Sequence, residues 1–281
     1  MASPEFCSIF EYIYTYHMEI IASLQNTKIK NIVRLLSKSK ERKSQNIVVF
    51  EGARELSLAT SAGYEVNSVF VCREIFSKSE YPDVLDAIPD KLIYEVTLPV
   101  FQKIAYREGS DGLITLAIPK YLKFDDLILS DNPFIIILEA VEKPGNLGAI
   151  LRTADAAAVD TVIICDPLAD LYNPNVIRSS VGCAFTVQTV ACTSEEAFDW
   201  LKKKNISTYA AELEASSWYQ DADFFKPSAI IMGTEADGLT DFWLKNANHR
   251  IKIPMRGKID SLNVSVSTAI ITFEAMRQRG F

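Results

Sequence analysis

Residues 134–154 read FIIILEAVEKPGNLGAILRTA and indicate how the C-terminal half of the chain folds. The stretch begins with five apolar, mostly β-branched residues, which is typical of a strand buried on both faces of a parallel sheet. A Pro-Gly turn follows the strand, and a helical pattern follows the turn. Polar side chains therefore collect at the carboxyl end of a buried strand, where open α/β sheets bind ligands.

Two residues of this stretch could carry chemistry. Asn146 is well placed to cap the helix, and Arg152 falls within its second turn. Each residue also has an ordinary explanation, because an asparagine at a helix start is commonly a cap and an arginine on a helix is commonly a surface ion-pair partner. The segment alone leaves both interpretations open.

Further apolar runs alternate with helical stretches on the C-terminal side. The predicted strands lie at 134–138, 161–165, 185–190, 206–210, 229–232 and 251–253. Strands that alternate with helices predict a doubly wound α/β domain with a parallel sheet. We expect this domain to span residues 133–281.

The residues before this domain show a second, smaller α/β pattern. Its predicted elements are an amphipathic helix at 24–37, strands at 47–50, 66–72, 92–96 and 112–118, a helix near 81–88 and a helix after Leu98. A polar stretch at 121–132 ends in turn-forming residues and is the expected linker. The prediction is therefore an N-terminal extension at 1–23, a domain at 24–120, the linker, and the larger domain.

The net charge of the chain limits how it could bind nucleic acid. The 281 residues carry a formal net charge of −7, which argues against a protein that coats nucleic acid non-specifically. Residues 28–43 nevertheless hold seven basic side chains against the single acid Glu41. This segment is either a solvated helix face or a patch that faces RNA.

Metal and membrane sites are not expected. The five cysteines show no CxxC spacing, and the chain has only two histidines, His17 and His249. A zinc site or a histidine-based nucleophilic triad is therefore hard to assemble. No window approaches the roughly 20 apolar residues of a membrane span, and we expect a cytoplasmic protein with reduced cysteines.

A second polar segment, IIMGTEADGL at 230–239, again follows an apolar run. Gly233 and Gly238 would allow a ligand to approach the backbone closely. The GxxxxGK[ST] signature of a phosphate loop is absent, and the acids Glu235 and Asp237 would repel phosphate. The ordinary alternative is that both acids merely cap a helix.

A third segment, IPMRGKIDSLNVSVSTA at 253–269, opens the last predicted helix. Hydroxyl and amide side chains compete with backbone hydrogen bonding, so a cluster of them at a helix start is unusual. Capping explains one or two of these side chains but not all four, which are Ser261, Asn263, Ser265 and Ser267.

In this order the three segments resemble the signature motifs of the SpoU/TrmH-type RNA 2'-O-ribose methyltransferases of the SPOUT superfamily. The matching residues are NLGAILR at 146–152, MGTEADGL at 232–239 and SLNVSVS at 261–267. The resemblance implies a C-terminal α/β SPOUT fold with a parallel sheet and a deep trefoil knot. It also implies a homodimer that uses S-adenosyl-L-methionine as methyl donor.

The same resemblance implies roles for ten residues. The catalytic residues would be Asn146, Arg152, Glu235, Ser261 and Asn263. The cofactor would be held near Met232, Gly233, Ile253, Met255 and Leu262. We expect Arg152 to position a phosphate or the hydroxyl rather than to act as a general base, because the pKa of a guanidinium normally exceeds about 12.

The N-terminal pattern resembles the ribosomal-protein-like RNA-binding domains carried by rRNA 2'-O-methyltransferases, on the strength of FEGAR at 50–54. The expected RNA contacts are Lys28, Lys30, Arg34, Arg42 and Arg54. An additional RNA-binding domain favours rRNA of the 23S type over tRNA as substrate. A tRNA 2'-O-methyltransferase and a non-catalytic RNA-binding assembly factor of the same fold remain alternatives, whereas a dehydrogenase would need a GxGxxG motif that is absent.

Overall fold

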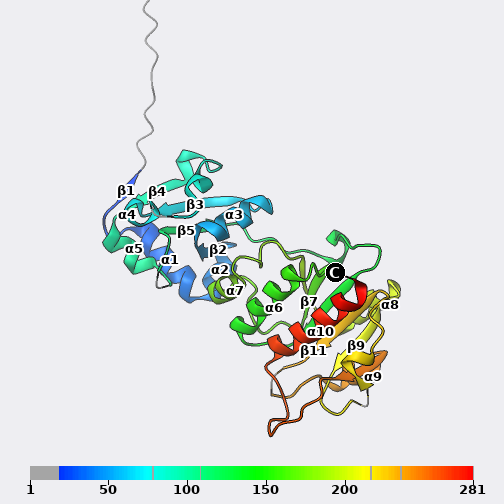
Figure 1. Cartoon of the computed structure of the whole chain (residues 1–281). Coiled ribbons are helices and arrows are strands. Elements are labelled where there is room, and N and C mark those ends of the chain that lie inside the picture. The colour runs from blue at the N-terminus through cyan, green and yellow to red at the C-terminus, as the bar shows by residue number, and fades with distance from the viewer. Residues whose placement is uncertain (1–18, 78, 108, 216, 235, 281) are drawn as a thin grey trace, which may run out of the picture.

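Two β-sheets organise the part of the chain that the computed structural model describes, namely residues 19–77, 79–107, 109–215, 217–234 and 236–280 (Figure 1). One sheet is built from the N-terminal half and has five strands, and the other is built from the C-terminal half and has seven. We call the parts built on these sheets the N-terminal domain and the C-terminal domain.

The N-terminal sheet is mixed, with the strand order β1-β4-β3-β5-β2. Its strands are β1 Ile20–Ile21, β2 Val48–Glu51, β3 Val66–Val71, β4 Ile93–Val96 and β5 Leu113–Ala117. Its helices are α1 Thr27–Ser37, α2 Ser39–Gln45, α3 Ala53–Ser61, α4 Arg73–Phe76 and α5 Leu98–Ile104. The predicted helix near 81–88 is wrong, because only the short 3₁₀ turns η1 Pro82–Leu85 and η2 Asp90–Leu92 form there, and each begins at or just after a proline.

Successive side chains of these strands point to opposite faces of the sheet. Val49 of β2 packs in one apolar cluster with α1 and α5. Val48 and Phe50 pack on the other face with α3, in a cluster that continues into the C-terminal domain. The α3 face of the sheet is therefore the one that meets the C-terminal domain.

The C-terminal sheet is parallel at every pairing and has the order β10-β12-β9-β11-β6-β7-β8. Its strands are β6 Phe134–Glu139, β7 Thr161–Cys165, β8 Thr189–Cys192, β9 Ser207–Ala211, β10 Ser217–Trp218, β11 Ser228–Met232 and β12 His249–Lys252. Its helices are α6 Pro144–Ala156, α7 Pro174–Ser179, α8 Ser194–Lys203, α9 Asp241–Asn246 and α10 Val264–Arg279, with 3₁₀ turns η3 Phe124–Asp126 and η4 Tyr219–Asp221.

Helices cover both faces of this sheet, which explains its continuous apolar strands. Helices α6 and α10 lie side by side on one face, packed on Ile136 and Ile230 (Figure 1). Helices α8 and α9 cover the other face, packed on Ile135 and Ile231. The predicted α/β fold with a parallel sheet is confirmed. Among the described residues, no helix has both the length and the apolar character that crossing a membrane requires.

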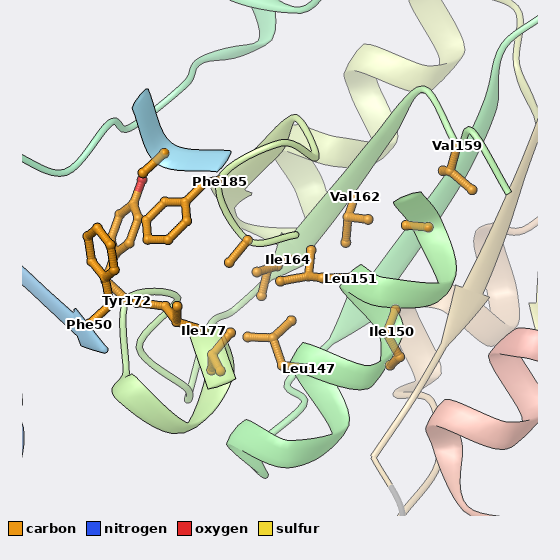
Figure 2. Packing of buried hydrophobic residues seen from close by; sticks show 14 of the residues in the cluster. Phe50, Leu147, Ile150, Leu151, Val159, Val162, Ile164, Tyr172, Ile177 and Phe185 are labelled. Carbon is orange, nitrogen blue, oxygen red and sulfur yellow. The ribbon is translucent and has the colours of Figure 1, made fainter. Parts of the chain in front are cut away.

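The predicted strand at 185–190 begins too early, since β8 starts at Thr189. Phe185 instead stands in a turn and packs against the N-terminal domain (Figure 2). Its ring centroid lies 4.7 Å from that of Phe50 and 5.0 Å from that of Tyr64. A contact between domains thus accounts for an apolar residue that the periodic pattern had assigned to a strand.

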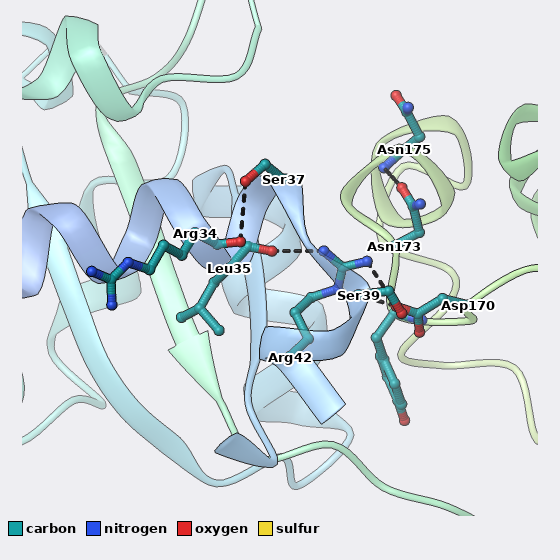
Figure 3. Close-up of polar contacts among 9 residues, drawn as sticks. Arg34, Leu35, Ser37, Ser39, Arg42, Asp170, Asn173 and Asn175 are labelled. Atoms are coloured by element: carbon teal, nitrogen blue, oxygen red, sulfur yellow. Dashed lines mark hydrogen bonds and ion pairs between the residues drawn. The ribbon is translucent and has the colours of Figure 1, made fainter. Parts of the chain in front are cut away.

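Polar contacts join the two domains beside this apolar patch. The hydroxyl oxygens of Tyr64 and Tyr172 lie 3.0 Å apart. The guanidinium of Arg42 donates to the Asp170 carboxylate through Nη2 at 2.7 Å and through Nε at 3.1 Å (Figure 3). Apolar packing and a buried ion pair therefore fix the N-terminal domain against the C-terminal one.

Candidate active site

A cavity of about 450 Å³ lies at the carboxyl ends of β9, β11 and β12. Its volume is within the range of roughly 300–1,000 Å³ found for small-molecule sites. Its wall includes all five residues predicted to hold the cofactor, which are Met232, Gly233, Ile253, Met255 and Leu262. Ser261, from the predicted catalytic set, lines the same cavity.

The loop after β11 is closed on itself at Gly233. A Cβ atom at this position would lie 2.2 Å from the carbonyl carbon and oxygen of Gly238, so only glycine fits without moving the backbone. The amide of Thr234 donates to the carbonyl of Gly238 at 3.0 Å, and the amide of Gly238 donates back at 3.2 Å. This tight turn therefore presents bare main chain at Gly233 and Gly238 to the wall of the cavity.

A buried carboxylate anchors the far end of this loop. Glu139, at the end of β6, is 3 % exposed and accepts hydrogen bonds from the Thr240 amide at 2.8 Å and from the Thr240 hydroxyl at 2.6 Å. The Ser194 hydroxyl lies 3.5 Å from the same carboxylate and receives the indole N–H of Trp243 at 3.1 Å. Glu139 therefore ties strand β6 to the loop that forms the cavity.

Sequence reasoning did not identify Glu139 or Thr240 as site residues. The signal for Glu139 was present, because an acid directly follows five apolar residues that must be buried. Buried carboxylates need partners. Nothing in the sequence pointed to Thr240, which lies 101 residues further along the chain.

Two of the predicted catalytic residues meet beside the cavity. The Nδ2 of Asn263 donates to the Oδ1 of Asn146 at 3.1 Å. Asn263 also caps α10, since its Oδ1 accepts from the Ser265 amide at 2.9 Å. The interpretation of Asn146 as a helix cap is wrong, because α6 begins at Pro144 and Asn146 lies inside its first turn.

Arg152 lies further along α6 and is exposed. It is not among the residues that line the cavity, and it makes no hydrogen bond or ion pair with the described residues. The predicted catalytic residue Glu235 lies outside the described residues. The structure thus pairs Asn146 with Asn263, places Ser261 in the wall of the cavity and leaves Arg152 outside that wall.

The predicted RNA contacts divide into three groups. Lys30 and Arg34 are exposed on α1, and Lys28 is partly buried there against Tyr94 and Glu19. Arg54 is exposed at the start of α3.

The prediction for Arg42 is wrong, because this residue is only 4 % exposed. Its guanidinium is bonded to Asp170 and to the carbonyl oxygen of Leu35 and cannot reach RNA (Figure 3).

The wall of the cavity is acidic. Among the described residues, the cavity is lined by four carboxylates and only one lysine, namely Glu212, Glu214, Asp237, Asp260 and Lys252. Arg250 neutralises Glu212 from outside the cavity, which leaves the other acids to set its field. Such a wall favours a ligand with positive charge and disfavours one that carries several phosphates. No group of three or more His, Cys, Asp or Glu in the described part of the chain is arranged to hold a metal ion.

Comparison with family models matches both halves of the chain. The model of the SpoU rRNA Methylase family matches residues 133–273, and that of the MRM3-like substrate binding domain matches residues 26–115.

Similar proteins and structures extend over most of the chain. The 23S rRNA (guanosine(2553)-2'-O)-methyltransferase of Bacillus subtilis is 28% identical over 91% of this chain and 98% of its own length. A crystal structure of an RNA 2'-O ribose methyltransferase has a TM-score of 0.82 and 39% identity, covering 92% of this chain and 99% of that one. The AdoMet-bound rRNA methyltransferase of Sinorhizobium meliloti has a TM-score of 0.83 and 26% identity, covering 92% and 98%.

Proposed function

This chain belongs to the SpoU rRNA Methylase family, and we propose that it transfers a methyl group from S-adenosylmethionine to a ribose 2'-hydroxyl of ribosomal RNA. The observation that carries the proposal is the cavity at the carboxyl ends of β9, β11 and β12, with the Asn146–Asn263 pair beside it. Relatives that methylate 23S rRNA, and an N-terminal half similar to a substrate-binding domain, support rRNA over tRNA.

The residues of the cavity fit this cofactor. S-adenosylmethionine supplies an electrophilic methyl group on a sulfonium and carries an ammonium group. Asp237 and Asp260 give the wall the negative charge that suits such a cation. Leu239 and Leu262 provide apolar surface for a flat heteroaromatic ring, and the bare main chain at Gly233 permits close approach.

The remaining residues act on the RNA in this proposal. Methyl transfer requires the 2'-oxygen to lie in line with the methyl group and to lose its proton. Arg152 binds the phosphate next to the target ribose through its guanidinium fork and stabilises the negative charge that develops on the 2'-oxygen. Asn146, Ser261 and Asn263 orient the ribose, and Glu235 completes the set.

The finer features of the proposal concern assembly. Helix α10 exposes Val266 and Phe273, with 47% and 41% of their surface accessible, and Ile270 lies between them on the same helical face. These three side chains form a partly exposed apolar stripe along α10, which supports a homodimer with α10 in its interface.

We also infer a deep trefoil knot formed by the segment from Gly233 onward. The domain limits in this proposal are 24–120 and 133–281, joined by a linker. The location is cytoplasmic, which suits an rRNA substrate.

The test of the function uses the purified full-length chain with methyl-labelled S-adenosylmethionine and total RNA from a strain that lacks the protein. We expect the label on one ribose 2'-oxygen of 23S rRNA, mapped by resistance of the adjacent phosphodiester to alkaline hydrolysis. Label on a base, or label confined to tRNA, would refute the proposal. Absence of calorimetric binding of S-adenosylmethionine would favour the non-catalytic assembly factor.

Glu139→Ala is expected to weaken the binding of S-adenosylmethionine by about tenfold, because a hydrogen bond to a charged group contributes roughly 1.5–3 kcal/mol. Two such bonds from Thr240 hold the end of the loop that lines the cavity. Glu139→Gln keeps a carbonyl acceptor for the Thr240 amide and should bind the cofactor better than the alanine variant. Isothermal titration calorimetry measures both.

Ser194→Ala is the matched control for this prediction. It removes the partner of the Trp243 indole and leaves the two bonds from Thr240 to Glu139 in place. It should lower the free energy of unfolding and leave cofactor affinity near the wild-type value. Equal losses of affinity in the Glu139→Ala and Ser194→Ala variants would show that the network acts only on stability.

A further inference from the structure

A single turn, residues 181–186, is held between helices of the two domains. On one side the Thr186 hydroxyl donates to the Asp155 carboxylate of α6 at 2.7 Å. On the other side the turn packs on α3, since a Cβ atom at Gly182 would lie 2.8 Å from the Cδ1 of Leu58 and 3.4 Å from the Cα of Glu55. We call the surface where α3 and α6 flank this turn the interdomain seam.

An arginine stands on each side of the interdomain seam. Arg54 precedes Glu55 on α3, and Arg152 lies one helical turn before Asp155 on α6. Both side chains are exposed, and neither makes a hydrogen bond or ion pair with the described residues. These two guanidinium groups lie on opposite sides of one turn and come from segments almost 100 residues apart in the sequence.

Both guanidinium groups lie within electrostatic reach of one thiol in this turn. Burial and the Asp155 carboxylate raise the pKa of Cys183 to about 11, while Arg54 and Arg152 oppose this rise. The nearby acids are already engaged, because Asp155 accepts from Thr186 and Glu55 is paired with Arg107 at 3.2 Å. Among the described residues neither carboxylate forms an ion pair with Arg54 or Arg152, so the two guanidinium groups are available to a ligand.

A third arginine adds positive charge where the domains meet. Arg178 of α7 is exposed, and its guanidinium carbon lies 5.9 Å from the ring centroid of Tyr106 in the N-terminal domain. Helix α7 adjoins α6, since a Cβ atom at Gly148 would lie 1.9 Å from the Oγ of Ser179. Arg178 therefore lies on the helix next to the one that carries Arg152, which is one turn further along α6 than Gly148.

The basic residues of α1 are arranged differently. Helix α1 packs on the face of the N-terminal sheet opposite to α3, and the apolar cluster beneath it contains no residue of the C-terminal domain. Lys30 and Arg34 are exposed on this helix, and Lys28 is partly buried against Glu19 and Tyr94. The basic segment of the sequence therefore does not supply the arginines of the interdomain seam.

We propose that the interdomain seam is the RNA track of this protein, and that the strand carrying the target ribose runs from Arg152 across residues 181–186 to Arg54. This inference rests on the proposed function and adds the path of the substrate to it. Guanidinium groups bind phosphates bidentately, and phosphate contacts fix the register of a nucleic acid on a protein. The phosphates beyond the target bind Arg54 and Arg178, so both domains hold the same strand.

The fixed contact between the domains sets the register of an RNA strand bound along this track. Phe50 and Phe185 pack at the same seam, with ring centroids 4.7 Å apart (Figure 2). Arg54 is consequently held at a set distance from Arg152, and a strand bound at Arg54 presents its target nucleotide at a defined place. A flexibly tethered domain would raise local concentration without setting this register.

The experiment compares two double charge reversals in the full-length protein. Arg54→Glu/Arg178→Glu is expected to weaken binding of protein-free 23S rRNA by about tenfold or more and to lower the salt slope of log Kd by roughly two phosphate contacts. The effect should appear in KM for RNA, and the Kd for S-adenosylmethionine should stay unchanged. Lys202→Glu/Lys203→Glu on α8 changes the net charge equally, far from the seam, and should shift RNA affinity much less.

Each remaining outcome decides the proposal. The proposal would be overturned if Arg54→Glu/Arg178→Glu bound RNA as tightly as the α8 control. It would also be overturned if Lys30→Glu/Arg34→Glu lost more RNA affinity, because the RNA track would then lie on α1. Arg54→Lys keeps the charge and should recover part of the affinity. A wild-type protein that neither binds S-adenosylmethionine nor methylates rRNA would refute the proposed function instead, while loss of RNA affinity on reversal at the seam would still support the track.

Discussion

Arg152→Ala is expected to slow methyl transfer by about 10²–10³-fold, the loss that follows removal of one group stabilising developing negative charge in an active site. The affinity for S-adenosylmethionine should not change, because Arg152 does not line the cavity. The fold should also persist, since the side chain is exposed and makes no hydrogen bond or ion pair with the described residues. Single-turnover transfer at saturating RNA measures the chemical step, and calorimetry measures cofactor binding.

Arg152→Lys separates positioning from proton transfer. A lysine keeps the positive charge and loses the planar fork, so it should restore part of the rate at every pH if Arg152 binds a phosphate. A general base would behave differently, because replacing a guanidinium by an ammonium of lower pKa would move the pH profile of the rate. An alanine variant with wild-type turnover, or one that loses cofactor affinity, would contradict the assigned role.

The pattern of buried strands predicts the edge of the sheet at which the cavity lies, whereas the five residues expected to hold the cofactor rest on the resemblance of 230–239 and 253–269 to family motifs. Continuous apolar runs such as 134–138 identify strands of a parallel sheet, and the carboxyl ends of parallel strands share one edge. Met232 and Ile253, which are far apart in sequence, therefore reach the same cavity. Local pattern and topology therefore predict the position of the cavity in the sheet, and the resemblance predicts the individual residues.

Two features that the sequence did not reveal depend on contacts between the domains. Phe185 completes an apolar run and fits the pattern of a strand, yet it packs on Phe50 of the other domain. Arg42 belongs to a basic run and fits the pattern of a surface residue, yet Asp170 buries it from 128 positions away. No local periodicity encodes such partners, because both residues satisfy the pattern of the segment in which they stand.

The ion pair between Arg42 and Asp170 leads to the prediction with the largest effect on stability. Asp170→Ala is expected to lower the free energy of unfolding by about 3–5 kcal/mol, because it leaves a buried guanidinium without its counter-charge. The side chains of Arg42 and Asp170 are only 4% and 15% exposed, and their closest nitrogen and oxygen atoms lie 2.7 Å apart. Ser39 also donates to Asp170 at 3.0 Å and would lose this acceptor.

A matched pair of variants distinguishes the lost charge partner from simple loss of packing. Arg42→Met/Asp170→Leu removes both charges and fills the space with apolar side chains, and such replacements of buried ion pairs are often neutral or stabilising. The double variant should therefore be more stable than Asp170→Ala in urea-induced unfolding followed by circular dichroism. If Asp170→Ala alone were as stable as the wild type, the pair would not fasten the domains together. The domain contact at Arg42 holds Arg54 in register with Arg152. RNA affinity should therefore fall in the destabilised Asp170→Ala variant and recover in the Arg42→Met/Asp170→Leu variant.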